Sequence, residues 1–255
     1  MKKIDKTTAI ALMTQAKNEN RPMIEADHLV KTYGRFAAVT DVSFRISAGE
    51  VVAFLGVNGA GKSTTMKLLT GYIPPTSGTA RIAGIDMTTN RTEGARHLGY
   101  LPENGPLYPD MTPESMLSFF AGLYSIERPR RAEAIDRAIE LCSLEPVRRK
   151  PIGRLSKGYR QRVGMAHVLL HQPEVLILDE PTTGLDPRQI LQMRETIRRI
   201  GRERTILLST HILQEVSAVA TRVLFINKGR LVFDGPAAEF DTARAEKRFT
   251  ELSAD

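Results

Sequence analysis

The sequence contains 255 residues, of which 42% are hydrophobic, so the chain can bury a substantial core as one large domain or as two smaller lobes. Its 36 Lys and Arg against 29 Asp and Glu give a formal net charge of +7, but only 6% of the residues are aromatic, which leaves few platforms for stacking on nucleic-acid bases. The single cysteine, Cys142, excludes an intramolecular disulfide, fits a reducing compartment and is expected to be a small buried hydrophobe.

Residues 1–22 are expected to form a loose, partly helical extension ahead of the folded domain. They begin with basic residues, but Asp5 and Lys6 precede a very short apolar run at 9–13, which argues against a signal peptide. No stretch of the sequence approaches the ~20 apolar residues needed to span a bilayer. We therefore expect any role at a membrane to depend on another chain.

Two strands and a glycine-rich loop come next. Residues 42–46 alternate between apolar and polar, which predicts a half-buried strand of an antiparallel sheet beside a parallel core. The apolar run at 51–55 predicts a buried strand, and a loop of the pattern G-x-x-x-x-G-K-S follows it directly. The residues of this loop are Gly56, Val57, Asn58, Gly59, Ala60, Gly61, Lys62, Ser63 and Thr64.

Such a loop predicts a phosphate-binding site. Its glycines allow a tight turn that directs several backbone N–H groups at one point. Lys62 brings a cation to the β- and γ-phosphates, and Ser63 offers a hydroxyl to Mg²⁺. Alone, the motif indicates only a nucleotide-binding protein of the P-loop type.

The middle of the chain combines a turn-rich segment with a basic one. Residues 104–112 carry Leu107, Tyr108 and Met111, and apolar side chains on a loop need a partner, which the following predicted helix can supply in part. Residues 127–162 hold eleven Lys or Arg and five Asp or Glu. This cluster could face an anionic membrane, nucleic acid or only solvent. We favour the solvated face, because no nucleic-acid-binding module is recognisable.

The second half begins with the apolar run 175–178, which predicts a buried strand that ends in Asp179 and Glu180. In a P-loop ATPase the first carboxylate suits Mg²⁺, and the second can polarise the water that attacks the γ-phosphate. The alternative is a strand followed by solvated acids. Farther on, the runs 223–226 and 231–233 flank a short turn and predict a closing β-hairpin, before a mixed-charge tail that is expected to be a surface helix.

Three further motifs lie around these strands. They are Leu155-Ser156-Lys157-Gly158-Tyr159-Arg160-Gln161-Arg162, Thr183-Gly184-Leu185-Asp186-Pro187 and Ile206-Leu207-Leu208-Ser209-Thr210-His211. With them, the order of motifs over residues 23 to about 235 resembles the ATP-binding cassette (ABC) ATPase family. The phrases LPEN at 101–104 and LSKGY at 155–159 most resemble the ABC-2 export branch, which includes gliding-motility-type ATPases.

The resemblance implies an α/β fold of the P-loop NTPase type. It would have a RecA-like parallel core, an antiparallel β subdomain and an inserted helical subdomain at about 104–165. The ATPase domain would cover 23–235, between the N-terminal extension 1–22 and a C-terminal helical tail at 236–255.

The resemblance also implies ATP and Mg²⁺ as cofactors. The loop from Gly56 to Thr64 would bind the phosphates, and Ser63 and Asp179 would hold the metal. Tyr33 would stack on the adenine, which needs only a flat aromatic face. Read without the family, Tyr33 is a turn or core tyrosine.

Three residues carry hydrolysis in this interpretation. Glu180 would be the catalytic carboxylate, and His211 would be the switch histidine that contacts the γ-phosphate, although a lone histidine after a strand is more often a capping or surface residue. Glu103 falls where the family has a glutamine that contacts Mg²⁺ and the attacking water. A carboxylate is acceptor-only and adds negative charge, so tighter Mg²⁺ dependence is the expected result of this departure.

Other residues would act on a second subunit. Ser156 and Gly158 match the signature motif, which completes the γ-phosphate site of the opposite subunit through a hydroxyl and a helix-start N–H group. Lys157 and Tyr159 replace the more usual Gly and Gln of that motif. Asp186 matches the D-loop, which meets the phosphate loop of the partner.

The favoured function is the ATP-binding and ATP-hydrolysing subunit of a membrane transporter, with a lean towards ABC-2-type export. It would act by ATP-driven dimerisation, as a homodimer or with a second cassette, on the cytoplasmic face of the cell membrane. A separate transmembrane permease would be its partner, with a cytoplasmic helix received beside residues 104–112. The sequence does not name the cargo.

The alternative function is a soluble ABC ATPase that acts on nucleic acid or ribosomes. Ribosomal relatives generally carry two cassettes and DNA-repair relatives a long coiled coil, and the sequence has neither. A nucleotide or small-molecule kinase is disfavoured, because such enzymes lack the signature and switch motifs.

Overall fold

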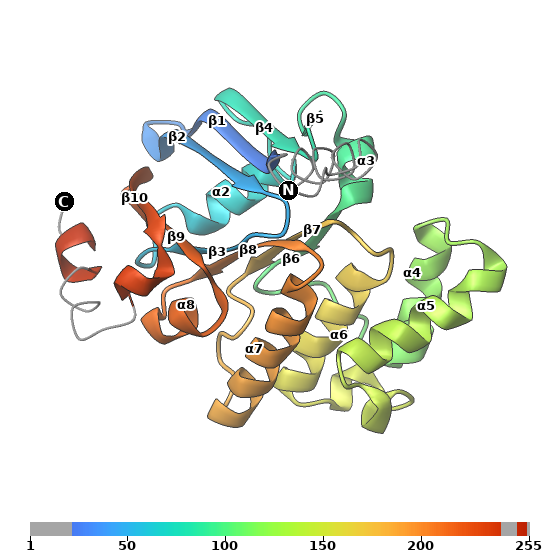
Figure 1. Ribbon diagram of the computed structural model, residues 1–255. Coiled ribbons are helices and arrows are strands. Elements are labelled where there is room, and N and C mark those ends of the chain that lie inside the picture. Colours follow the sequence, from blue (N-terminus) through green and yellow to red (C-terminus); the bar gives the residue numbers. More distant parts are fainter. Residues whose placement is uncertain (1–21, 241–248, 254–255) are drawn as a thin grey trace, which may run out of the picture.

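The computed structural model of the protein describes residues 22–240 and 249–253. Two β-sheets face each other, and helix α2 lies between them (Figure 1). Further helices cover the opposite face of the larger sheet. The predicted extension at 1–22 falls outside the described residues, except for Pro22.

The smaller sheet is antiparallel and has the strand order β2-β1-β4-β5. Its strands are β1 (Pro22–Tyr33), β2 (Phe36–Ser47), β4 (Ser77–Ile82) and β5 (Ile85–Asp86). Within β2, Val42, Phe44 and Ile46 are buried and the residues between them are exposed, so the strand predicted from the alternation at 42–46 is confirmed.

The larger sheet has the strand order β10-β9-β3-β8-β7-β6. Its strands are β3 (Val51–Leu55), β6 (Leu98–Leu101), β7 (Val175–Asp179), β8 (Thr205–Thr210), β9 (Arg222–Asn227) and β10 (Arg230–Pro236). All pairs are parallel except β9 with β10, which form the predicted closing hairpin. The carboxyl ends of β3, β7 and β8 therefore meet at one edge of the sheet.

Seven α-helices, four 3₁₀ turns and a helical segment at 249–253 complete the described part of the chain. The helices are α2 (Lys62–Leu69), α3 (Arg91–Gly94), α4 (Pro113–Leu123), α5 (Arg128–Leu141), α6 (Lys157–Leu169), α7 (Pro187–Gly201) and α8 (Leu213–Val219). The 3₁₀ turns are η1 (Ala95–His97), η2 (Glu145–Val147), η3 (Ile152–Arg154) and η4 (Ala237–Phe240). None of the described helices is both long and apolar enough to cross a membrane.

The central residues of the parallel strands are mostly apolar because both faces of the sheet are covered. In β7, Val175 and Ile177 pack into the core with α2 and the small sheet, whereas Leu176 and Leu178 pack into the core with the helices beneath. Cys142 is fully buried in the latter core, as predicted, and burial raises the pKa of its thiol to about 12. This rigid sheet positions the loops at its carboxyl edge.

The start of the C-terminal tail packs onto the protein. η4 (Ala237–Phe240) buries Phe240, which stacks with Phe225 of β9 at a ring distance of 6.4 Å. Phe249 contacts the same Phe225 ring edge-on at 5.3 Å. The surface helix is predicted for the mixed-charge run 237–251, of which residues 241–248 lie outside the described residues, as do residues 254–255 of the tail.

Candidate active site

The glycine-rich loop connects β3 to α2 and presents an open helix start. Gly61 is the N-cap of α2 with a φ of 107°, and no side chain caps the first N–H groups of the helix. A side chain at Gly61 would come within 2.6 Å of the Ala38 carbonyl oxygen, so only glycine fits. The uncapped N–H groups and the positive end of the helix dipole favour an anion at this point.

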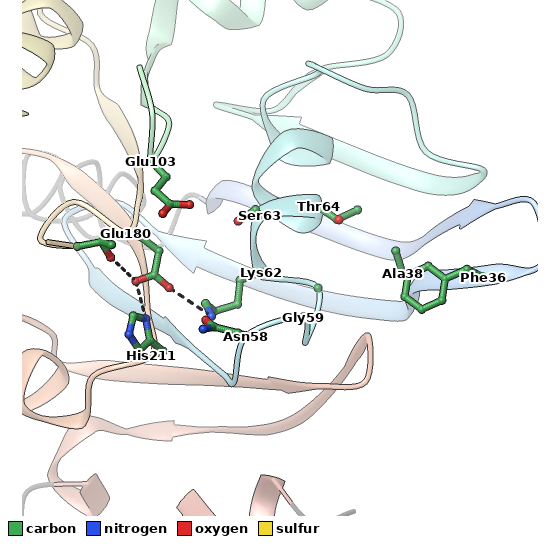
Figure 2. A pocket seen from close by; sticks show the side chains of 12 residues that line it. Phe36, Ala38, Asn58, Gly59, Lys62, Ser63, Thr64, Glu103, Glu180 and His211 are labelled. Carbon is green, nitrogen blue, oxygen red and sulfur yellow. Dashed lines mark hydrogen bonds and ion pairs between the residues drawn. The ribbon is translucent and has the colours of Figure 1, made fainter. Parts of the chain in front are cut away.

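Lys62 lies inside this loop and is 6% exposed. Its Nζ donates to the carbonyl oxygens of Gly56 at 2.8 Å and Val57 at 3.3 Å. The same Nζ lies 3.3 Å from Oε1 of Glu180, so the predicted phosphate-binding cation and the predicted catalytic carboxylate form a buried ion pair. Figure 2 shows Glu180 between Lys62 and His211.

Glu180 directly follows the last residue of β7 and is 7% exposed. Its backbone N–H donates to Ser209 Oγ at 3.0 Å, which ties it to the neighbouring strand β8. Oε2 lies 2.9 Å from Nδ1 of His211 and accepts a hydrogen bond from Thr183 Oγ1 at 3.2 Å. The carboxylate is thus held from three sides, in agreement with a positioned group and not with a solvated acid.

Ser63 and Asp179 lie side by side and offer hard oxygen ligands. Ser63 Oγ donates to Asp179 Oδ1 at 3.3 Å, and Ser209 Oγ donates to the same oxygen at 2.6 Å. Octahedral Mg²⁺ with ligands at about 2.1 Å separates neighbouring ligands by about 3 Å, so this pair fits the ion. Within the described ranges no group of three His, Cys, Asp or Glu side chains could hold a metal. The ion would therefore need phosphate oxygens or water as further ligands.

A cavity of about 380 Å³ unites most of these groups. Its lining comprises Phe36, Ala38, Asn58, Gly59, Gly61, Lys62, Ser63, Thr64, Glu103, Glu180, Thr183 and His211. Glu103 lies on the loop after β6, and Figure 2 shows it on the other side of Glu180 from His211. Phosphate loop, carboxylate and histidine, which are distant in sequence, thus surround one space large enough for part of a nucleotide.

Comparison with known proteins identifies the family. A family profile described as ABC transporter matches residues 39–183. The bacitracin transport ATP-binding protein BcrA of Bacillus licheniformis is 38% identical over 228 residues, which are 89% of this chain and 72% of BcrA. The chain therefore belongs to the ABC transporter family. As a member it is an ATP-binding protein with the fold of the P-loop NTPases.

Two further similarities agree with this family membership. The probable multidrug ABC transporter ATP-binding protein YbhF of Escherichia coli (strain K12) is 36% identical over 217 residues, 84% of this chain but only 37% of YbhF. A solved structure of the ATP-binding subunit of an ABC transporter superposes with a TM-score of 0.80 at 29% identity, over 90% of this chain and 99% of that chain.

Not every predicted site residue of this ABC protein lies at the cavity. The signature residues Ser156 and Gly158 are at the start of α6, and Asp186 is the N-cap of α7; none of them is among the described residues that line the cavity. Ala60, which belongs to the phosphate loop, is buried, at 3% exposure. Tyr33 is also outside the lining, half-exposed, with Lys31 Nζ 5.4 Å from its ring centre.

The signature motif instead contacts the D-loop of the same chain. A side chain at Gly158 would come within 2.5 Å of Oε1 of Gln189 on α7, so glycine allows the starts of α6 and α7 to approach. A side chain at Gly184 would overlap the ammonium group of Lys157. Lys157, which departs from the usual signature motif, therefore fills the space beside the D-loop.

Sequence reasoning missed three residues of the site. Phe36, the cross-strand partner of Tyr33, is 64% exposed and lines the cavity, so it presents an aromatic face there. The sequence feature that could have indicated Phe36 is an aromatic residue at the start of the strand after the Gly34-Arg35 turn. Ser209 and Thr183 hold Asp179 and Glu180 by side-chain hydrogen bonds, and both lay inside motifs without an assigned role.

Proposed function

We propose that the chain is the ATP-hydrolysing subunit of a membrane transporter. The observation that carries this proposal is the buried Glu180 carboxylate, fixed between Lys62, His211 and Thr183 at the mouth of the phosphate loop. Glu180 polarises the attacking water, Lys62 neutralises the phosphates, and His211 holds the carboxylate and contacts the γ-phosphate.

Ser63 and Asp179 would hold Mg²⁺, which when bound would supply positive charge to stabilise the transition state of phosphoryl transfer. Support for this role is the contact between their oxygens at 3.3 Å. Glu103 lines the same cavity and reaches the ion directly or through water. Tyr33 stacks on the adenine together with Phe36.

ATP binding closes two cassettes around two nucleotides. The signature residues Ser156 and Gly158 lie outside the chain's own cavity, at the start of a helix with no acidic residue in its first turn. Such a helix start is suited to the phosphate of a nucleotide bound by another subunit. Asp186 meets the phosphate loop of the partner in this arrangement.

A separate transmembrane permease docks beside residues 104–112. A groove of about 520 Å³ adjoins this segment and is lined by Glu103, Leu107 and Tyr72, among others. Tyr108 packs on Phe119 at a ring distance of 6.2 Å, yet both remain about half exposed, at 46% and 53%. The internal packing therefore satisfies only part of this apolar surface, and a partner helix would cover the rest.

The proposed docking to a permease implies a domain organisation and a location for the chain. We propose that residues 23–235 form the ATPase domain and that its helical part at about 104–165 moves as a unit on nucleotide binding. The chain acts on the cytoplasmic face of the cell membrane. The names of BcrA and YbhF point to drug-like cargo, which supports an ABC-2-type exporter.

The soluble alternative has weaker support, because the basic cluster is partly neutralised within the protein. Arg148 pairs with Glu114 at 2.6 Å, Asp136 at 2.8 Å and Glu145 at 3.8 Å. Arg149 also pairs with Glu114. A cation that is already paired contributes little to binding a polyanion.

The test compares Glu180→Gln with Lys62→Ala in the full chain. Positioned general bases contribute ~10²–10⁴-fold, so Glu180→Gln should lower Mg²⁺-dependent ATP turnover by about that factor while ATP binding persists. Lys62→Ala should weaken ATP binding itself. With ATP present, Glu180→Gln should drive dimerisation of a chain that is otherwise mostly monomeric, as measured by light scattering. A rate of ATP hydrolysis by Glu180→Gln within a few-fold of wild type would contradict the assignment of Glu180 as the catalytic carboxylate.

A further inference from the structure

Glu215 of α8 is a buried carboxylate that joins two segments of the active site. It is 2% exposed, and its oxygens accept hydrogen bonds from two threonines. Thr182 Oγ1 donates to Oε1, and Thr210 Oγ1 donates to Oε2 at 2.5 Å. Both threonines are buried as well, at 3% and 0% exposure.

The two threonines belong to the segments that carry the candidate catalytic groups. Thr182 lies two positions after Glu180, and Thr210 immediately precedes His211. Strands β7 and β8 are parallel, and their pairing ends at Asp179 opposite Ser209. Beyond this point side chains have to hold the two segments in register.

The chemistry of Glu215 suits this task. Within residues 22–240 and 249–253 no ion pair to Glu215 occurs, so the hydroxyls satisfy its oxygens. A buried carboxyl group is costly unless its oxygens are hydrogen-bonded, and here both threonine hydroxyls donate to them. Thr210 Oγ1 then has a lone pair free to accept from the backbone N–H of Ile212, at 3.0 Å. The backbone is therefore fixed on both sides of His211.

We propose that Glu215 is a positioning residue for ATP hydrolysis. Its clamp on Thr182 and Thr210 sets the spacing at which His211 Nδ1 and Glu180 Oε2 make their 2.9 Å contact. Glu215 itself touches no reacting atom. The inference rests on the proposed hydrolytic role of Glu180, which it deepens by naming what holds the carboxylate and the histidine together.

Glu215→Ala in the full chain should separate turnover from binding. A misplacement of about 1 Å at a catalytic group costs on the order of 100-fold, so we expect kcat for ATP to fall about 10- to 100-fold. The KM and the Kd for ATP should change less than about threefold, because the phosphate loop and Lys62 are untouched. Glu215→Gln keeps one acceptor oxygen and should recover part of the loss. Thr210→Val should resemble Glu215→Ala, and Thr210→Ser, which restores the hydroxyl, should recover most activity.

Val216→Ala is the matched control. Val216 is the fully buried neighbour of Glu215 on the same helix and packs in an apolar core. Its truncation should lower the melting temperature while leaving kcat per folded molecule unchanged. An equal loss of kcat in Val216→Ala and Glu215→Ala would mean that Glu215 only stabilises α8, which overturns the proposal.

A double-mutant cycle with Glu180→Gln, measured as single-turnover ATP hydrolysis, distinguishes positioning from a change in protein stability. If Glu215 acts by positioning Glu180, Glu215→Ala should have little further effect in the Glu180→Gln background. The same fold loss in both backgrounds, or wild-type kcat in both Glu215→Ala and Glu215→Gln, would overturn the inference alone. Wild-type turnover by Glu180→Gln would instead overturn the proposed function itself.

Discussion

Glu180 adopts a backbone conformation that few side chains tolerate. Its φ is 51°, in the left-handed region, which costs a non-glycine residue about 1–2 kcal/mol. Such strain persists only where the surroundings over-determine the residue. Two hydrogen bonds supply that constraint, one from its N–H to Ser209 and one from Thr183 to its carboxylate. Together with the unusual backbone conformation, they fix the direction of the carboxylate.

Glu103 is one of the residues expected to depart from the family pattern, and its substitution tests the proposed metal site. Glu103→Ala removes an exposed carboxylate from the cavity, so the Mg²⁺ concentration for half-maximal ATPase activity should rise several-fold. This follows if the carboxylate contributes one hydrogen bond or ligand, about 1 kcal/mol. ATP binding without Mg²⁺ should not weaken, because a negative charge is lost beside the phosphates.

Glu203→Ala provides the control for Glu103→Ala. Glu203 is also exposed, but it lies just ahead of β8, at the end of that strand opposite His211. Its loss should leave the Mg²⁺ titration of ATPase activity unaltered. An unshifted titration in Glu103→Ala as well would contradict the metal-binding role of Glu103.

At the scale of the elements, α4 and α6 meet through a partly buried histidine. The rings of Phe120 and His167 are 3.9 Å apart, and Tyr124 Oη lies 2.9 Å from His167 Nε2. Burial raises the pKa of Tyr124 to about 12, so its hydroxyl stays protonated. It donates the hydrogen bond when His167 Nε2 is the unprotonated ring nitrogen. Burial and the neighbouring His171 lower the pKa of His167 to about 4.

The lowered pKa of His167 predicts acid sensitivity of this helix contact. Between pH 6.5 and about 4 the unfolded chain binds a proton that the folded chain does not, so the free energy of unfolding should fall as the pH falls through this window. The loss from His167 is at most on the order of 3 kcal/mol. The pKa of His171 is lowered too and acts in the same direction.

Chemical denaturation at pH 7.5 and pH 5 measures this effect. His167→Gln keeps an acceptor for Tyr124 without titrating, so it should flatten the pH dependence of stability. His28→Gln is the control, because the hydrogen bond that His28 donates to Asp41 raises the pKa of His28, and its stabilisation is instead lost as the pH rises. An unchanged slope in His167→Gln would refute the assignment.

Those parts of the candidate site that lie within one element, or at the ends of neighbouring strands, could be predicted from the sequence. The phosphate loop is local, since Gly61, Lys62 and Ser63 carry their chemistry within one turn of chain. Glu180 and His211 were predictable as neighbours, because parallel strands bring their carboxyl ends to one edge. Contacts such as Thr182 with Glu215 depend instead on strand register and side-chain direction over long separations. For the base, sequence favoured Tyr33, and only the fold placed its hairpin neighbour Phe36 at the cavity.

At the scale of the whole molecule, the loop after β6 connects the ATP cavity to the docking surface proposed above. Glu103 lines both the cavity and the adjoining groove, and Leu107 lies four positions farther along the same loop. A shift of Glu103 on nucleotide binding would therefore move the lining of the groove directly, and the core of the sheet would not have to rearrange. The helical part of the chain, including α4, would carry that shift to a permease.

A double variant, Leu107→Asp with Tyr108→Lys, tests whether the permease docks at this surface. Charges in an apolar docking surface cost free energy on burial, so recovery of the transmembrane partner from detergent-solubilised membranes should fall at least about tenfold. ATP binding by the variant should persist, because neither residue lines the nucleotide cavity. Val232→Lys is the matched control, since Val232 is partly exposed on β10, across the molecule from α4 (Figure 1), and the charge there should leave recovery unchanged. Equal recovery of the partner by the double variant and the wild type, with ATP binding intact in both, would show that permeases dock elsewhere.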